Sequence, residues 1–141
     1  MDQVDDIYCS RFNVATWNAT GIMSSASYLA SFLEDNNISV CGVSEHWLHK
    51  QDMYFMDCIN SNYISLSTYD NDLDIPSNRR VGKGGTSLLW HRDLASNVSP
   101  LDLNCNNLVG IQIMIRLALT YIYCKCMFRV KTILQEFTTN I

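Results

Sequence analysis

Residues 11–48 read RFNVATWNATGIMSSASYLASFLEDNNISVCGVSEHWL and decide the fold class of this chain. The run 11–17 alternates and carries β-branched and aromatic side chains, which predicts a strand ending at Asn18. Gly21 then breaks the strand, and Ser24 or Ser25 can cap a following helix. An apolar stripe at three- and four-residue spacing predicts that this helix buries one face. The residues of the stripe are Tyr28, Leu29, Phe32 and Leu33.

The segment 38–43 is a second short apolar run and predicts another strand after the helix. A right-handed crossover of this length makes the two strands parallel, so both carboxyl ends emerge at one edge of the sheet. Asn18 and Glu45 stand at those two ends. We therefore expect an α/β fold with two polar side chains at one sheet edge.

The rest of the chain adds further strands. We expect a short helix over 51–58 and strands over 63–68 and 86–91, separated by a charged loop over 70–83. Two more apolar runs, 108–115 and 119–126, also predict strands. The whole stretch 108–128 has the length of a membrane span, but its Gln112, Arg116 and Lys125 and its β-branched content favour buried strands.

Composition narrows the function classes. The chain has 141 residues, 48% of them hydrophobic and 17% charged, with a net charge of −4. Disorder is not indicated, and a broad basic surface for polyanions is disfavoured, whereas a metal-dependent phosphodiesterase is compatible with this balance.

The six cysteines form no Cys-x-x-Cys pair, so we expect reduced thiols and no zinc site. Residues 1–6 do not resemble a signal peptide, so an intracellular protein is expected.

Three stretches resemble one known superfamily. They are TWNATG at 16–21, GVSEHWL at 42–48 and VGKGGTSLLW at 81–90. Together they resemble the N-terminal half of endonuclease/exonuclease/phosphatase (DNase I-like) domains. The sequence of residues 44–48, SEHWL, is most similar to that of the endonuclease domains of LINE-type retrotransposons. The implied fold is a truncated DNase I-like α/β sandwich, essentially one mixed sheet with helices on its outer face.

The resemblance implies catalytic and metal-binding roles for two residues. Glu45 would ligate Mg²⁺ or Mn²⁺, and Asn18 would help to fix the metal and a phosphate of DNA. The implied chemistry is sensible, because Mg²⁺ is usually bound by one or two carboxylates together with phosphate oxygens and water. The simpler alternative is that Asn18 is a turn residue and Glu45 a solvated surface charge.

Arg79, Arg80 and Lys83 are the best local basic cluster for contacting a DNA backbone, although a solvated loop is the simpler interpretation. The glycines in 82–85 do not match a phosphate-binding loop, and we expect them to serve a bend into the next strand. His46 and His91 are assigned structural or surface roles and not that of a general base.

The family pattern stops before the end of the chain. No Gly-Asp-Phe-Asn or Ser-Asp-His motif occurs, and Cys126 and Phe128 stand where the family has Tyr and Pro. We therefore expect an N-terminal tail over 1–10, a partial domain over 11–128 and an unrelated tail over 129–141. Such a partial domain would leave an apolar sheet face exposed and open to self-association.

Two functions follow from the resemblance. The first is a fragment of a retrotransposon-type Mg²⁺ endonuclease, intracellular and in a nuclear setting, that is inactive as this chain. The second is a catalytically dead relic that binds at most a metal or a protein. The substrate is left open among abasic DNA, duplex DNA and a phosphoinositide. A protein-interaction module is a third hypothesis, with no motif behind it.

Overall fold

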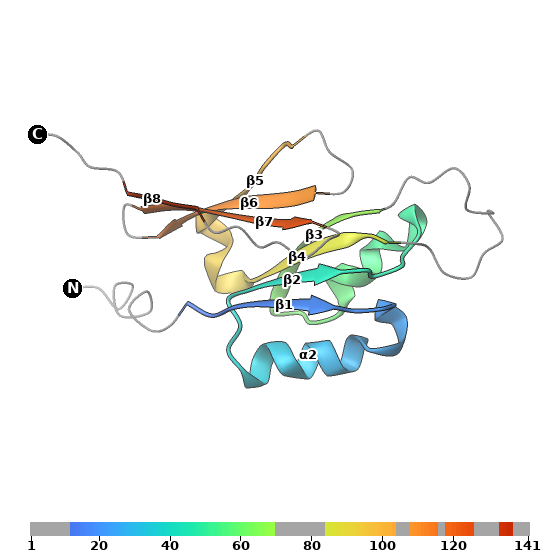
Figure 1. Ribbon diagram of the computed structural model, residues 1–141. Coiled ribbons are helices and arrows are strands. Elements are labelled where there is room, and N and C mark those ends of the chain that lie inside the picture. Colours follow the sequence, from blue (N-terminus) through green and yellow to red (C-terminus); the bar gives the residue numbers. More distant parts are fainter. Residues whose placement is uncertain (1–11, 70–83, 104–107, 116–117, 126–132, 137–141) are drawn as a thin grey trace, which may run out of the picture.

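The computed structural model describes residues 12–69, 84–103, 108–115, 118–125 and 133–136. The expected DNA contacts Arg79, Arg80 and Lys83 lie outside these residues. Figure 1 shows the helix α2 on one side of a sheet and a second sheet on the other side. In chain order the elements are β1 (Val14–Asn18), η1 (Ile22–Ser24), α2 (Ala26–Asp35), β2 (Val40–Ser44), η2 (Lys50–Cys58), β3 (Tyr63–Thr68), β4 (Thr86–His91), η3 (Arg92–Asn97), β5 (Val98–Pro100), β6 (Leu108–Ile115), β7 (Ala118–Lys125) and β8 (Ile133–Glu136).

The first sheet, sheet A, has the strand order β1-β2-β4-β3. β1 and β2 are parallel, from the pair Val14 and Val40 to the pair Asn18 and Ser44. β4 is antiparallel to both β2 and β3. The sheet is therefore mixed, and the parallel strands joined by a helix confirm the expected crossover.

The outer face of sheet A is covered by α2. Leu29 and Leu33 of the helix are buried in one cluster with Cys41 and Val43 of β2 and Leu89 of β4. The spacing of the apolar stripe therefore predicted the buried positions Leu29 and Leu33 correctly, but it was wrong for Tyr28, which is 67% exposed at the side of the helix. Helix capping differs from the expectation: the Ser25 hydroxyl makes no cap and instead donates to the Gly21 carbonyl oxygen at 3.2 Å. The residue keeps its place before the helix, but its hydroxyl serves the preceding turn.

The second sheet, sheet B, has the order β5-β6-β7-β8 and packs on the inner face of sheet A. Side chains from both sheets share one buried cluster, formed by Val40, Leu88, Trp90, Val109, Ile111, Ile113 and Ile122. The layered DNase I-like α/β class is as expected, but the chain supplies more than the one mixed sheet. Since β6 and β7 fold back over β2 and β4, the inner face is covered there, and the expectation of an exposed apolar sheet face is wrong for these two strands.

Uncovered apolar surface remains on this face at Val14 of β1. Val14 is 40% exposed, and Thr16 beside it is also exposed. β1 is an edge strand of sheet A, so sheet B does not reach across it. Self-association through this part remains a prediction.

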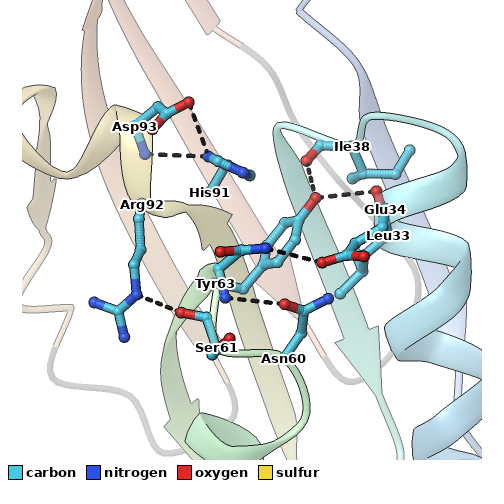
Figure 2. Close-up of polar contacts among 10 residues, drawn as sticks. Leu33, Glu34, Ile38, Asn60, Ser61, Tyr63, His91, Arg92 and Asp93 are labelled. Atoms are coloured by element: carbon cyan, nitrogen blue, oxygen red, sulfur yellow. Dashed lines mark hydrogen bonds and ion pairs between the residues drawn. The ribbon is translucent and has the colours of Figure 1, made fainter.

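The end of sheet A that lies away from Asn18 is fastened by polar contacts (Figure 2). The buried hydroxyl of Tyr63 donates to the carbonyl oxygens of Leu33 at 3.0 Å and Ile38 at 2.6 Å. Nearby, Asn62 donates from Nδ2 to Glu34 Oε1 at 2.9 Å. Burial, with Glu34 and then Cys41 as smaller causes, raises the pKa of Tyr63 to about 12. These bonds join β3 to the end of α2.

The C-terminal part of the chain continues sheet B. β8 pairs antiparallel with β7 from Ala118 and Glu136 to Tyr121 and Ile133. It falls within the segment 129–141 that the sequence predicts to be unrelated to the domain, and that boundary stays a prediction. Residues 108–115 and 118–125 are strands, as predicted. Of the helices in the described ranges, none is long and apolar enough to cross a membrane.

Candidate functional site

Asn18 and Glu45 lie at the same edge of sheet A. Asn18 ends β1, and Glu45 directly follows β2, the parallel neighbour of β1. Backbone hydrogen bonds continue beyond the strands, from Ala19 N to Ser44 O at 2.9 Å and from Gly21 N to Glu45 O at 3.0 Å. The prediction that these residues end neighbouring parallel strands is confirmed.

The Asn18 side chain closes a tight turn. Its Oδ1 accepts hydrogen bonds from the backbone N–H of Thr20 at 3.0 Å and from Thr20 Oγ1 at 2.9 Å. Because a backbone N–H can only donate, the orientation of the Asn18 amide is fixed. Its Nδ2 has no hydrogen-bond partner among the residues described and remains available to donate.

The Glu45 carboxylate is half-buried and available. No hydrogen bond or ion pair engages it within the described part of the chain. Its backbone has a positive φ of 54°, a region that residues with a side chain seldom occupy. Such conformations cluster at functional sites, where neighbouring structure holds them in place.

His46 is part of the structure that holds Glu45 in place. Its side chain is fully buried, Nδ1 accepts from the Leu48 N–H at 3.0 Å, and Nε2 lies 2.7 Å from the Thr68 carbonyl oxygen. Nε2 must therefore carry the proton and donate to Thr68. Burial lowers the pKa of His46, while the bond to Thr68 acts the other way. The expected structural role is confirmed.

Gly84 and Gly85 complete the support of this loop. Both have positive φ, 57° and 87°, and their carbonyl oxygens accept from the N–H groups of Trp47 at 2.9 Å and His46 at 3.4 Å. A Cβ on Gly85 would lie 2.1 Å from His46 Cε1. The predicted glycine bend is confirmed, and the packing of the His46 ring on Gly85 is a second reason for it that the sequence pattern does not show.

The other histidine singled out in the sequence, His91, has a local role. Its Nδ1 accepts from the Asp93 N–H at 3.1 Å and so caps η3. It lies at the end of β4 remote from Asn18, in the area drawn in Figure 2. The structure does not bring it to the edge that carries Glu45.

The donor set at the Glu45 edge suits a hard cation bound through few protein ligands. Within the described ranges, no group of three or more His, Cys, Asp or Glu side chains could hold a metal ion. One unengaged carboxylate nevertheless fits Mg²⁺, which keeps several waters and shares phosphate oxygens. Asn18 fits less well as a direct ligand, because its Oδ1 already accepts two hydrogen bonds, and its amide N–H group suits a phosphate or a water instead.

The two sheets with α2 outside form the layered architecture of the DNase I-like fold. A solved structure with this architecture is that of the AP endonuclease LMAP from Leishmania major, which superposes with a TM-score of 0.62 at 14% sequence identity. The match covers 88% of this chain and 43% of that enzyme, so this chain spans less than half of its length. No protein-family model and no curated protein sequence matches the chain.

Proposed function

We propose that this chain is the N-terminal, metal-binding part of a DNase I-like phosphodiesterase that acts on DNA and uses Mg²⁺ or Mn²⁺. The observation that carries the proposal is the meeting of Asn18 and the unengaged Glu45 at one edge of a parallel strand pair. The sequence of residues 44–48 supports the proposal that this phosphodiesterase is a retrotransposon-type endonuclease.

The two residues divide the work by their chemistry. A divalent cation would supply charge to a phosphate oxygen, and Glu45 is the carboxylate that would hold it. The Asn18 Nδ2 group can donate to a phosphate oxygen or to a bound water, because its Oδ1 is fixed by Thr20. Binding and orientation of a phosphodiester are thus within reach of this edge.

We infer further that the chain alone is inactive. Hydrolysis also needs groups that orient the nucleophile and stabilise the oxyanion. The sequence contains neither the Gly-Asp-Phe-Asn nor the Ser-Asp-His motif that the resemblance would place there. The alternative function is a relic that binds only a metal or a protein. It shares the same metal site, but it does not belong to a longer polypeptide that is an active endonuclease.

Metal binding by Glu45 can be tested directly. We expect Glu45→Gln to weaken Mn²⁺ binding, measured by electron paramagnetic resonance, about ten-fold or more, because the variant loses a carboxylate that no described residue engages. Glu34→Gln is the matched control, since it removes the same charge from the far end of α2 and keeps an acceptor for Asn62. Equal Mn²⁺ affinity of Glu45→Gln and the unmodified chain would reject the proposed site.

A further inference from the structure

A row of four polar side chains crosses sheet A at the edge that carries Glu45. Asn18 pairs with Ser44, Ser44 with Thr86, and Thr86 with Thr68, so the row includes every strand of the sheet. Directly paired residues project to the same face of a sheet. All four side chains therefore face the same side.

That side faces sheet B. Side chains alternate along a strand, so Ser44 shares its face with Val40, and Thr86 shares its face with Leu88 and Trp90. These three apolar residues are buried against sheet B. Along the same face, the row that contains Val40 and Trp90 is apolar, whereas the last row before Glu45 is polar throughout.

The two central hydroxyl groups of the row are buried without partners. Ser44 is 4% exposed and Thr86 is 0% exposed, and neither Ser44 Oγ nor Thr86 Oγ1 makes a hydrogen bond among the described residues. A buried hydroxyl without a partner is costly and rare, so it calls for an explanation. Ser87, the next residue of β4, shows the usual situation: it is also 0% exposed, and its Oγ lies 2.6 Å from Ser67 Oγ.

The positions of the two hydroxyls suit one shared ligand. Ser44 and Thr86 are direct partners in an antiparallel strand pair, where Cα atoms lie about 4.5–5.5 Å apart. One oxygen atom between them can bond to both. The Asn18 Nδ2 group is next in the row, and Glu45 follows Ser44 in the chain.

We propose that Ser44 and Thr86 are positioning residues that bind the water shell of the divalent cation held by Glu45. The inference rests on the proposed function. Mg²⁺ and Mn²⁺ sites with few protein ligands retain water molecules, and each water needs hydrogen-bond partners. A hydroxyl can accept from such a water and donate to another oxygen, so the pair anchors the hydrated ion between Asn18 and Glu45.

Metal affinity and metal-free stability together test the pair. We expect Ser44→Ala and Thr86→Val each to weaken Mn²⁺ binding about ten-fold. Without metal, both variants should unfold at the same urea concentration as the unmodified chain or at a higher one, because they remove a buried hydroxyl that has no hydrogen-bond partner among the described residues. Thr86→Ser retains a hydroxyl and should keep its Mn²⁺ affinity.

Ser87→Ala is the matched control on the opposite face of β4. It should leave the Mn²⁺ affinity unchanged and lower the urea midpoint, because it breaks the bond to Ser67. Two results would overturn the inference. The first is that Ser44→Ala and Thr86→Val bind Mn²⁺ as tightly as the unmodified chain while Glu45→Gln binds it weakly. The second is that, without metal, these two variants lose as much stability as Ser87→Ala does. If Glu45→Gln also binds Mn²⁺ normally, the proposed function fails as well.

Discussion

His46 is the residue whose protonation should set the acid sensitivity of the chain. Burial lowers its pKa from the ordinary value of 6.5, so the unfolded chain takes up a proton before the folded chain does. The contribution of His46 to the free energy of unfolding is therefore fully present above about pH 6.5. It is lost as the pH falls below that value, with a slope of up to about 1.4 kcal/mol per pH unit. Urea unfolding between about pH 7.5 and pH 5 measures this slope.

The variant His46→Gln separates this effect from other acid effects. A glutamine amide can still donate to the Thr68 carbonyl oxygen but does not titrate, so the slope below pH 6.5 should become shallower. An unchanged slope in His46→Gln would contradict the assignment.

Gly85 should tolerate substitution worse than Gly21. An alanine Cβ at Gly85 would lie 2.1–2.6 Å from three atoms of the His46 ring, which is held by hydrogen bonds at both nitrogens. With the positive φ added, we expect Gly85→Ala to lower the free energy of unfolding by about 3 kcal/mol or more.

Gly21→Ala is the comparison for this prediction. Gly21 also has a positive φ, but its nearest contact would be 2.9 Å, to the half-buried Trp47 side chain. We expect a loss of about 1–2 kcal/mol. Denaturant unfolding measures the loss of stability in both variants. A larger loss for Gly21→Ala would contradict the prediction and would show that the His46 ring moves aside at little cost.

The sequence located Asn18 and Glu45 because strand ends can be read from alternation and from the residues that break it. It did not single out Ser44 and Thr86, whose importance depends on a cross-strand register that no local pattern contains. It also did not show that Asn18 Oδ1 is already engaged by Thr20. The type of a site residue is visible in sequence, whereas its free atoms depend on the fold.

At the scale of elements, the strands and helices with strong periodicity were predicted well. The strands at 63–68 and 86–91 match β3 and β4, and the short helix expected at 51–58 matches η2. β5 was missed, and β8 lies where a last helix or strand was expected, around 131–137, without a choice between the two. β5 is three residues long and includes Pro100, so only its pairing with β6 makes it a strand, and β8 similarly depends on β7.

The junction between β3 and α2 should depend on one hydroxyl group. Tyr63→Phe removes the hydrogen bonds to the Leu33 and Ile38 carbonyl oxygens while keeping the ring in place. Because these groups are buried, we expect the free energy of unfolding to fall by about 1–3 kcal/mol. Thermal and urea unfolding measure the change.

Tyr28→Phe is the control for this junction. Tyr28 lies on the same helix but is 67% exposed, so its substitution should change stability by less than about 0.5 kcal/mol. If Tyr63→Phe is equally neutral, the contacts in Figure 2 do not hold the two elements together.

The whole molecule differs from its sequence-based expectation in where the last strands pack. The apolar runs at 108–115 and 119–126 predict strands, which the structure has at 108–115 and 118–125, but they do not show where the strands pack. The structure folds them over the inner face, where Ile111, Ile113 and Ile122 meet Leu88 and Trp90. Burial of this surface favours a two-layer sandwich over one sheet with an open face.

Two packed sheets do not make a nuclease, and this difference leads to the prediction for the molecule as a whole. We expect the purified chain not to nick supercoiled plasmid in Mg²⁺ above a Glu45→Ala control. Metal, oriented nucleophile and oxyanion donors act together, and each missing element costs roughly ten-fold to a thousand-fold in rate. An intact DNase I-like endonuclease is the positive control. Mg²⁺-dependent nicking that Glu45→Ala abolishes would contradict the inactive state and would direct attention to Asp70, Asp72 and Asp74 as substitute groups, because His91 lies at the far end of β4.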